Sequence, residues 1–140
     1  MTLIINRQRA RIVKGKGWLE FIGRALKAVG TNREVTIVFV RDAAIQKLNQ
    51  QFRGKDYATD VLSFPTKAEA FERENQKHLG EVVISVDRAA TQAKQNGLTF
   101  ANEVKQLILH GLLHLCGYDH ETDNGEMNRL ELKLRKKLEI

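Results

Sequence analysis

Three of the four histidines fall within eleven residues near the end of the chain, in the segment HGLLHLCGYDH at 110–120. On a helix, four residues turn the chain by about 400°, so His110 and His114 would project in nearly the same direction, one turn apart. Gly117 can end such a helix in the left-handed conformation, and the reversal that follows can bring His120 back as a third ligand. Imidazole nitrogens commonly bind zinc. The segment therefore predicts a metal site.

A site with three protein ligands leaves one position of a tetrahedral ion free for water or substrate. This is typical of catalytic zinc, whereas structural zinc is normally closed by four protein ligands. Cys116 points about 160° away from His114 on a helical wheel, so we expect a packed core thiol and not a fourth ligand. One Zn²⁺ ion per chain is the predicted cofactor, and imidazole also suits nickel, copper and iron. The alternative is a set of core or surface histidines with ordinary hydrogen bonds. The isolated His78 is expected to be solvated.

The helix that carries the first two histidines is expected over residues 99–116, with Thr99 as its N-terminal cap. Its wheel is apolar on almost every side. The one polar seam consists of Glu103, Gln106, His110 and His114. Gly111 lies in the middle of this helix at a cost of about 1 kcal/mol relative to alanine, which indicates that another backbone passes close to it. The histidines would thus line the hydrophilic seam of an otherwise buried helix.

The rest of the chain alternates between short β-prone runs and amphipathic segments, without a repeat or a linker. Strands are expected at 2–6, 34–41, 61–64 and 79–86. Helices are expected at 18–29, 42–52, 87–96 and 122–139, with Asp42 and Asp87 as caps, and residues 66–78 as an exposed polar excursion. The pattern predicts a single domain over residues 1–140 of the α+β class, with about four strands and five helices and the histidine helix in its core.

Composition narrows the classes of protein further. With 140 residues, 42% hydrophobic and 29% charged, the chain has an ordinary globular balance. It has neither an apolar run of about 18 residues nor the pattern of a signal peptide, so we expect a soluble, cytoplasmic protein without membrane contact. A single cysteine excludes an internal disulfide.

The net charge of +6 is concentrated at one end of the chain. Residues 1–30 contain seven Lys and Arg residues against one Glu, whereas residues 31–140 contain sixteen of each sign. Arg7, Arg9 and Arg11 belong to this segment. It fits a surface that contacts a polyanion such as RNA, or else a solvated basic face that only keeps the protein soluble.

The histidine segment resembles the bacterial YbeY family of ribosomal RNA maturation endoribonucleases, together with LNQQFRGKDYATDVLSFP at 48–65 and LGEVVIS at 79–85. The resemblance implies a mixed sheet flanked by helices and zinc held by His110, His114 and His120. It also implies metal-dependent cleavage of single-stranded RNA, in 16S rRNA 3′-end maturation and ribosome quality control. The implied partners are ribosomal RNA and the small ribosomal subunit, with ribosomal proteins or GTPases.

The same resemblance singles out Arg53 as a catalytic or substrate-contacting residue, and we also predict His114 to be catalytic. A guanidinium can hold two phosphoryl oxygens at once as they gain negative charge, which lysine cannot reproduce. The local sequence also allows a purely structural ion pair of Arg53 with Asp56 or Asp60. Three acidic residues are candidates to orient the imidazoles or to transfer protons, namely Glu103, Asp119 and Glu121. Tyr57, Phe64 and Tyr118 are candidates to stack on bases, although core packing is the expected role of Phe64.

Two other functions stay open at this point. The spacing of the histidines is also similar to the long zinc motif of metzincin peptidases, but those enzymes have a glutamate as general base where this chain has Gly111. Without that base, a zinc peptidase or amide hydrolase would lose much of its rate. The third possibility is a ribosome assembly factor without catalytic activity.

Overall fold

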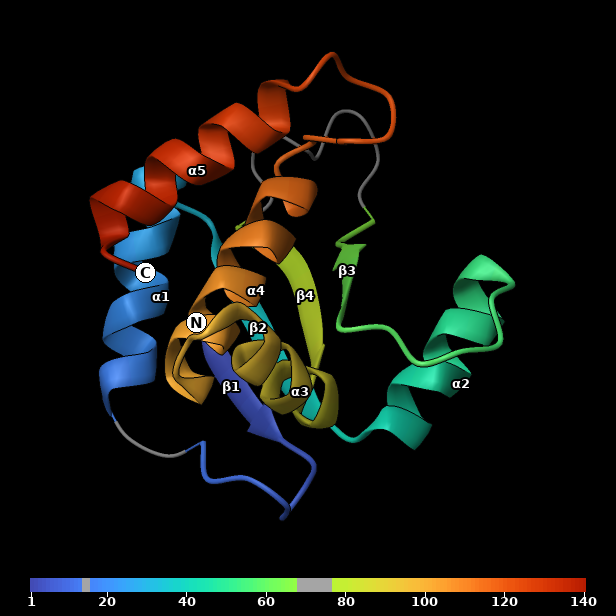
Figure 1. Cartoon of the computed structure of the whole chain (residues 1–140). Coiled ribbons are helices and arrows are strands. Elements are labelled where there is room, and N and C mark those ends of the chain that lie inside the picture. The colour runs from blue at the N-terminus through green and yellow to red at the C-terminus, as the bar shows by residue number, and fades with distance from the viewer. Residues whose placement is uncertain (14–15, 68–76) are drawn as a thin grey trace.

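A four-stranded mixed sheet forms the centre of the structure, a computed structural model that describes residues 1–13, 16–67 and 77–140. The strands are β1 (Leu3–Asn6), β2 (Glu34–Val40), β3 (Val61–Pro65) and β4 (His78–Ser85). They lie in the order β1-β2-β4-β3, where the first three are parallel and β3 runs antiparallel to β4 (Figure 1). The expected α+β class and mixed sheet are confirmed.

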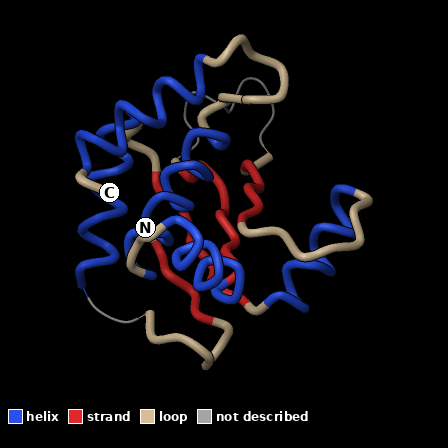
Figure 2. The backbone as a smooth tube through the Cα atoms, viewed as in Figure 1, coloured by secondary structure: helices blue, strands red, loops and turns tan. Residues whose placement is uncertain are grey.

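Five helices flank the sheet in the described parts of the chain (Figure 2). They are α1 (Lys16–Val29), α2 (Asp42–Arg53), α3 (Val86–Asn96), α4 (Phe100–Leu115) and α5 (Glu126–Leu138). Side chains of α1, α3, α4 and α5 share one hydrophobic core with the sheet, while α2 packs on the opposite face. Among these helices none combines the length and the apolar character that a membrane span would require.

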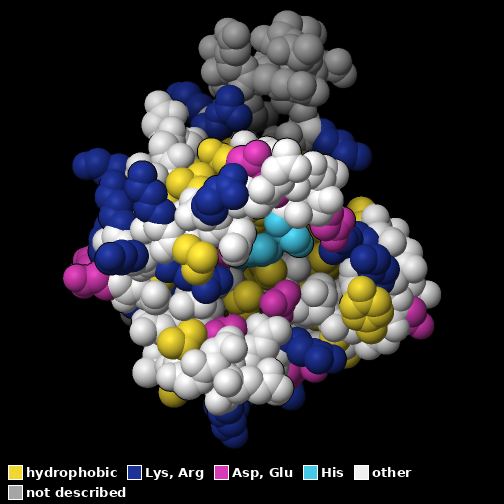
Figure 3. Space-filling model, turned by 45° about the horizontal axis from the view of Figure 1, so that its top comes forward, with side chains coloured by type: hydrophobic (Ala, Val, Ile, Leu, Met, Phe, Trp, Pro, Cys, Tyr) yellow, Lys and Arg dark blue, Asp and Glu magenta, His cyan; other side chains and the backbone are white. Residues whose placement is uncertain are grey.

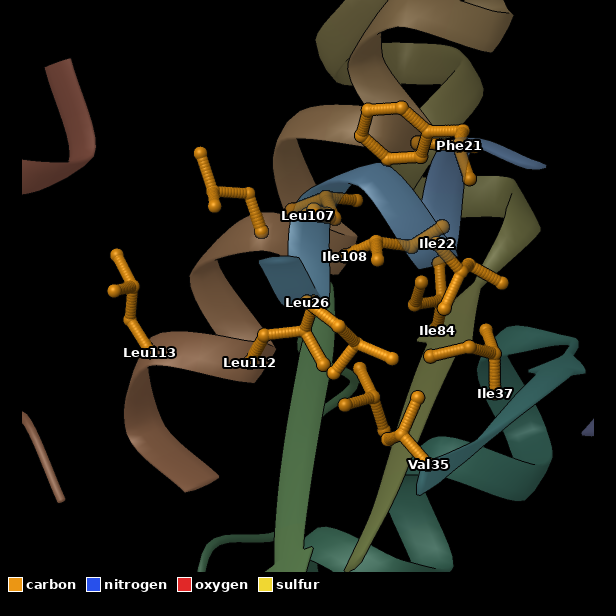
Figure 4. Packing of buried hydrophobic residues seen from close by; sticks show 14 of the residues in the cluster. Phe21, Ile22, Leu26, Val35, Ile37, Ile84, Leu107, Ile108, Leu112 and Leu113 are labelled. Carbon is orange, nitrogen blue, oxygen red and sulfur yellow. The ribbon is translucent and has the colours of Figure 1, made fainter. Parts of the chain in front are cut away.

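The alternation of side chains along β2 produces the two cores. Ile37 and Phe39 belong to the larger core, whereas Val38 and Val40 face α2 in the smaller one. On the larger side, three residues of α4 belong to the same core cluster as Val35, Ile37 and Ile84 (Figure 4). These α4 residues are Leu107, Ile108 and Leu112. The helix of the histidines is therefore buried in the core, as the wheel predicted.

At Gly111, α4 packs closely against the sheet. A Cβ built at this position would lie 2.6 Å from Cγ1 of Val82 and 3.2 Å from Oγ of Ser63. The prediction of a close neighbour is right, but its identity was wrong, because a side chain of β4 lies there and not a backbone. The Ser63 hydroxyl donates a hydrogen bond of 3.1 Å to the Gly111 carbonyl. Glycine thus lets α4 rest directly on β3 and β4.

Two helix caps differ from the sequence prediction, because long-range contacts use the predicted residues elsewhere. Arg41 occupies the N-cap of α2, and its side chain makes no capping hydrogen bond. The Asp42 carboxylate instead accepts a hydrogen bond of 2.7 Å from the Ser85 hydroxyl. Ser85 itself caps α3 through the amide of Arg88. Asp87 accepts both from the Arg41 side chain and from the Asp42 amide. This polar cluster joins the carboxyl ends of β2 and β4.

The ends of several other strands and helices differ from the predicted ones by a few residues. The last helix begins at Glu126, later than predicted, because the Asp123 carboxylate accepts hydrogen bonds from the amides of Gly125 and Met127. The expected excursion at 66–78 lies outside the described residues over 68–76. His78 was expected to be solvated, which is wrong: its ring lies between the hydroxyls of Thr36 and Thr66, at 3.0 and 2.8 Å.

We predict that Gly111→Ala lowers the free energy of unfolding by about 1–2 kcal/mol. Overpacking against Val82, which is fully buried, costs about 2–3 kcal/mol, and the higher helix propensity of alanine offsets about 1 kcal/mol of this cost. Urea denaturation of Gly111→Ala in the wild-type and Val82→Ala backgrounds measures the effect. The substitution should cost much less once the valine methyls are gone; an equal cost in both backgrounds would contradict the packing described above.

Candidate metal centre

The three histidine rings of the 110–120 segment converge on one point. One ring nitrogen of each lies within 4.8 Å of the others, and the ring centroids are 4.7 to 5.5 Å apart. Nε2 of His110 and Nε2 of His114 are separated by 3.1 Å. Two nitrogen ligands of a tetrahedral zinc ion would be roughly 3.3 Å apart, given Zn–N bonds of about 2.0–2.1 Å. The arrangement therefore fits a bound metal ion.

Two different elements supply these rings. His110 and His114 are half-buried on the last two turns of α4, and His120 is exposed in the turn that follows. Gly117 has a φ of 98°, in the left-handed region, and its amide donates to the His114 carbonyl at 3.0 Å. The Tyr118 amide then donates to the Leu113 carbonyl at 3.1 Å. The predicted glycine turn thus folds the chain back over the end of α4.

A buried carboxylate holds His110, and the sequence interpretation missed it. Glu131, on α5, is 6% exposed, and its Oε1 lies 3.0 Å from Nδ1 of His110. Burial acts to raise the pKa of Glu131, but the hydrogen bond and charge of His110 and the charge of Arg135 outweigh it, so this pKa lies below its usual range. Because the carboxylate only accepts, Nδ1 carries a proton, and it is therefore Nε2, which faces His114, that could bind a metal through its lone pair in the neutral ring.

The second ring of the helix is held in the neutral form that a metal requires. Burial, followed by the charges of His110 and His120, lowers the pKa of His114 below its ordinary value, and the Tyr118 backbone and Asp119 oppose this in part. At neutral pH His114 is therefore unprotonated and available as a ligand.

The acidic residues that the sequence suggested as partners of the imidazoles make other contacts. Oδ1 of Asp119 accepts from the Glu121 amide at 3.0 Å, which stabilises the turn. The Glu103 carboxylate is buried and accepts from the Asn96 side chain at 3.2 Å. No hydrogen bond between described residues joins any of these three carboxylates to a histidine of the cluster. Asp119 and Glu121 do line the groove beside the rings.

A groove of about 820 Å³ opens over the histidines, between the end of α2 and strand β3 on one side and the turn 117–121 on the other. Arg53 lines it, together with all three histidines. Figure 3 shows the rings at the bottom of this hollow, with basic and hydrophobic side chains exposed beside it on the side of α2.

Arg53 makes neither of the ion pairs that the local sequence allowed. The Asp56 carboxylate accepts from the Gln46 side chain at 3.1 Å, and that of Asp60 accepts from the Val61 amide at 2.8 Å. Within the described part of the chain, no carboxylate pairs with the Arg53 guanidinium. Its charge is therefore available to the groove.

The other predicted residues fall outside the histidine cluster. Cys116 is half-buried against the larger core, where burial raises the pKa of its thiol, in agreement with a packed core residue. Phe64 packs against the smaller core. Tyr57 and Tyr118 are exposed and line the groove.

The basic segment at the N-terminus lies away from the groove. The buried Gln8 side chain donates to Asn6 at 2.7 Å and to the carbonyl of Arg11 at 2.9 Å, which organises the loop after β1. In Figure 1 this loop lies at the lower end of the molecule, whereas the turn after α4 lies at the upper end. Arg7, Arg9 and Arg11 do not line the groove, and their contact with RNA stays a prediction.

The structure is thus that of an α+β protein with a mixed sheet, a buried helix and a group of three histidines that could hold a metal ion beside a groove. Comparison with known sequences identifies the family. Residues 4–139 match the family described as Endoribonuclease YbeY, and the chain belongs to that family.

Individual members of the family are similar to this chain in sequence over most of its length. The chain is 47% identical over 110 residues to the Endoribonuclease YbeY of Nautilia profundicola, which covers 79% of this chain and 76% of the relative. It is 39% identical over 138 residues to the Endoribonuclease YbeY of Koribacter versatilis, which covers 99% and 86%. The solution structure of TM1509 from Thermotoga maritima superposes with a TM-score of 0.61 at 29% identity, covering 98% of this chain and 87% of that one.

We predict that Glu131→Gln weakens the binding of Zn²⁺ by about 10- to 100-fold, because the amide replaces a charged acceptor behind His110 with a neutral one. Competition against a chromogenic chelator measures this dissociation constant. Glu126→Gln, an exposed acid on the same helix, is the matched control and should bind the metal like the wild type. An unchanged constant for Glu131→Gln in a folded protein would refute its role in orienting the ring.

Proposed function

We propose that this protein is a zinc-dependent endoribonuclease that cleaves single-stranded RNA, with His110, His114 and His120 as the metal ligands. The observation that supports this most is that one groove contains both the histidine cluster and Arg53. The family name of its relatives points to the same reaction. Zinc held by the three rings would supply Lewis acidity toward a phosphoryl oxygen, or lower the pKa of a water to about 7.

Arg53 is the proposed catalytic cation. It is exposed in the groove, with its acidic neighbours Asp56 and Asp60 engaged elsewhere, so its planar fork can contact two oxygens of the reacting phosphate. Such a contact stabilises the transition state more than the ground state, because negative charge grows on those oxygens during the reaction. His114, neutral at physiological pH, holds the metal and thereby contributes to catalysis.

A peptidase is the weaker alternative for the same site. Metzincins need a glutamate directly after the first histidine, and position 111 is a glycine in contact with Val82. A larger acidic side chain could not be accommodated there. The groove also contains Arg53, whose guanidinium pairs with no carboxylate of the described residues and suits a phosphate better than a peptide carbonyl.

The proposed substrate in the cell is ribosomal RNA. We infer that the protein acts in the cytoplasm on the 3′ end of 16S rRNA precursors and in ribosome quality control, at the small ribosomal subunit. Ribosomal proteins or GTPases are the proposed protein partners. The net charge of +6 supports association with a polyanion.

The decisive experiment compares RNA cleavage by Arg53→Ala and His114→Ala with that of the wild type. Arg53→Ala should lower the cleavage rate by about 100-fold or more with unchanged zinc content, because it removes only transition-state stabilisation. His114→Ala should lose both zinc and cleavage. Cleavage of a labelled single-stranded oligonucleotide, with zinc measured by elemental analysis, provides both values.

Lys133→Ala is the matched control, since this cation is exposed on α5, outside the basic segment 1–30, and does not line the groove. It should cleave like the wild type. If all variants cleave equally, the activity belongs to a contaminating nuclease and the proposal is wrong. Binding of ribosomal RNA that survives chelation, without any cleavage by the zinc-loaded wild type, would instead support a non-catalytic assembly factor, and cleavage of peptides alone would support the peptidase.

A further inference from the structure

Two aromatic side chains on one wall of the groove are unusually exposed. Phe52 at the end of α2 is 60% exposed and Tyr57 in the following loop is 53% exposed. Both line the groove above the histidines. Phe52 contacts Phe64 only edge-on, with ring centroids 5.2 Å apart. Aromatic rings of this size are normally much more buried, so a pair of open rings beside a candidate active site calls for a binding partner.

The loop that carries Tyr57 is held firmly against α2. Gly54 ends the helix in the left-handed conformation, with φ of 68°. The side chain of Asn49, which is fully buried, donates to the Tyr57 carbonyl at 2.9 Å. Gln46, also on α2, donates a hydrogen bond of 3.1 Å from its side-chain amide to the Asp56 carboxylate in the loop. The rings are therefore presented on a backbone that is ordered before any ligand arrives, which lowers the entropic cost of binding.

Two positive charges lie between these rings along the chain. Arg53 and Lys55 follow Phe52 and precede Tyr57 in sequence, and all four line the groove. Such a combination of cations and aromatic rings is typical of surfaces that bind single-stranded nucleic acid, where the cations contact phosphates and the rings stack on bases. A bound peptide could also pack against the two rings. It would not, however, offer Arg53 and Lys55 the regularly spaced phosphates of a nucleic-acid strand.

We propose that Phe52 and Tyr57 form a stacking platform for the bases that flank the cleaved phosphate. The proposal rests on the function proposed above and specifies how the groove selects its substrate. Bases in a duplex are stacked on one another and are not free to stack on protein rings. The platform therefore favours single strands, while Arg53 and the histidines act on the phosphate between the bases.

The test measures binding separately from cleavage, with protein stripped of metal by a chelator. The probes are a fluorescein-labelled decamer of riboadenosine, the same decamer with abasic riboses at its four central positions, and a blunt duplex of equal length. Fluorescence anisotropy should give dissociation constants for the single strand that rise by about 5- to 100-fold in Tyr57→Ala and in Phe52→Ala. Tyr57→Phe should bind like the wild type.

Leu132→Ala is the matched control, because Leu132 is 53% exposed on α5 and does not line the groove. It should leave every constant unchanged. The abasic probe should bind the wild type at least as weakly as the intact probe binds Tyr57→Ala, because it loses stacking on both rings, and its affinity should not fall further in that variant. The wild type should bind the duplex least tightly.

The platform would be refuted if Tyr57→Ala and Phe52→Ala bind the intact strand like the wild type, or if they weaken the abasic probe by the same factor. If the zinc-loaded wild type cleaves RNA in either of these cases, the platform alone is wrong. If it fails to cleave RNA while base-dependent binding persists, the platform stands and the proposed catalytic function is wrong. Preferential binding of an acidic peptide over the RNA strand would show that the rings serve a protein partner.

Discussion

The structure depends on the burial of one helix, α4, on every side except a narrow polar seam. Its apolar residues fill the larger core against β2, β4 and α1, and Gly111 allows its backbone to approach Val82 and Ser63 closely. A helix held in this way cannot rotate, because any rotation would expose leucines and bury imidazoles. The direction in which His110 and His114 point is therefore fixed by hydrophobic packing, before any metal or substrate is present.

The place of β3 decides which other residues join these histidines. β3 is the edge strand next to β4, and α4 rests on it from the larger core. Helix α2 belongs to the opposite face of the sheet, yet the segment that leaves it must pass this same edge to enter β3. Arg53 at the end of α2 is thereby brought to the groove over α4. Elements from both faces of the sheet contribute to one site, because the chain crosses from one face to the other at the edge formed by β3.

Much of this could be predicted from sequence, since the decisive signals were local. The helical spacing of His110 and His114, the stop at Gly117 and the return of His120 depend on neighbouring residues only, and the structure confirms their convergence. What escaped prediction depends on distant contacts. Glu131 is 21 residues from His110, and its one signal was an acid in the otherwise apolar stripe of Met127, Leu134 and Leu138.

The predicted N-caps of α2 and α3 were wrong for the same reason. Asp42 and Asp87 are good capping residues in isolation, but tertiary folding places them beside Ser85 and Arg41, and those stronger contacts take precedence. Likewise, nothing near His78 indicated that Thr36, from a different strand, would bind it. Local sequence predicts where a side chain points along its own element, whereas the partner it meets is decided by the assembled sheet.

The unequal anchoring of the three rings has a kinetic consequence. His110 and His114 belong to a buried helix, while His120 is exposed in a turn whose hydrogen bonds run to itself and to the last turn of α4. Opening that turn would disturb little of the core, and such local openings need far less free energy than global unfolding. Exchange of an ion with the solvent would then proceed through a hinged third ligand, at a rate set by the turn and independent of the overall stability of the protein.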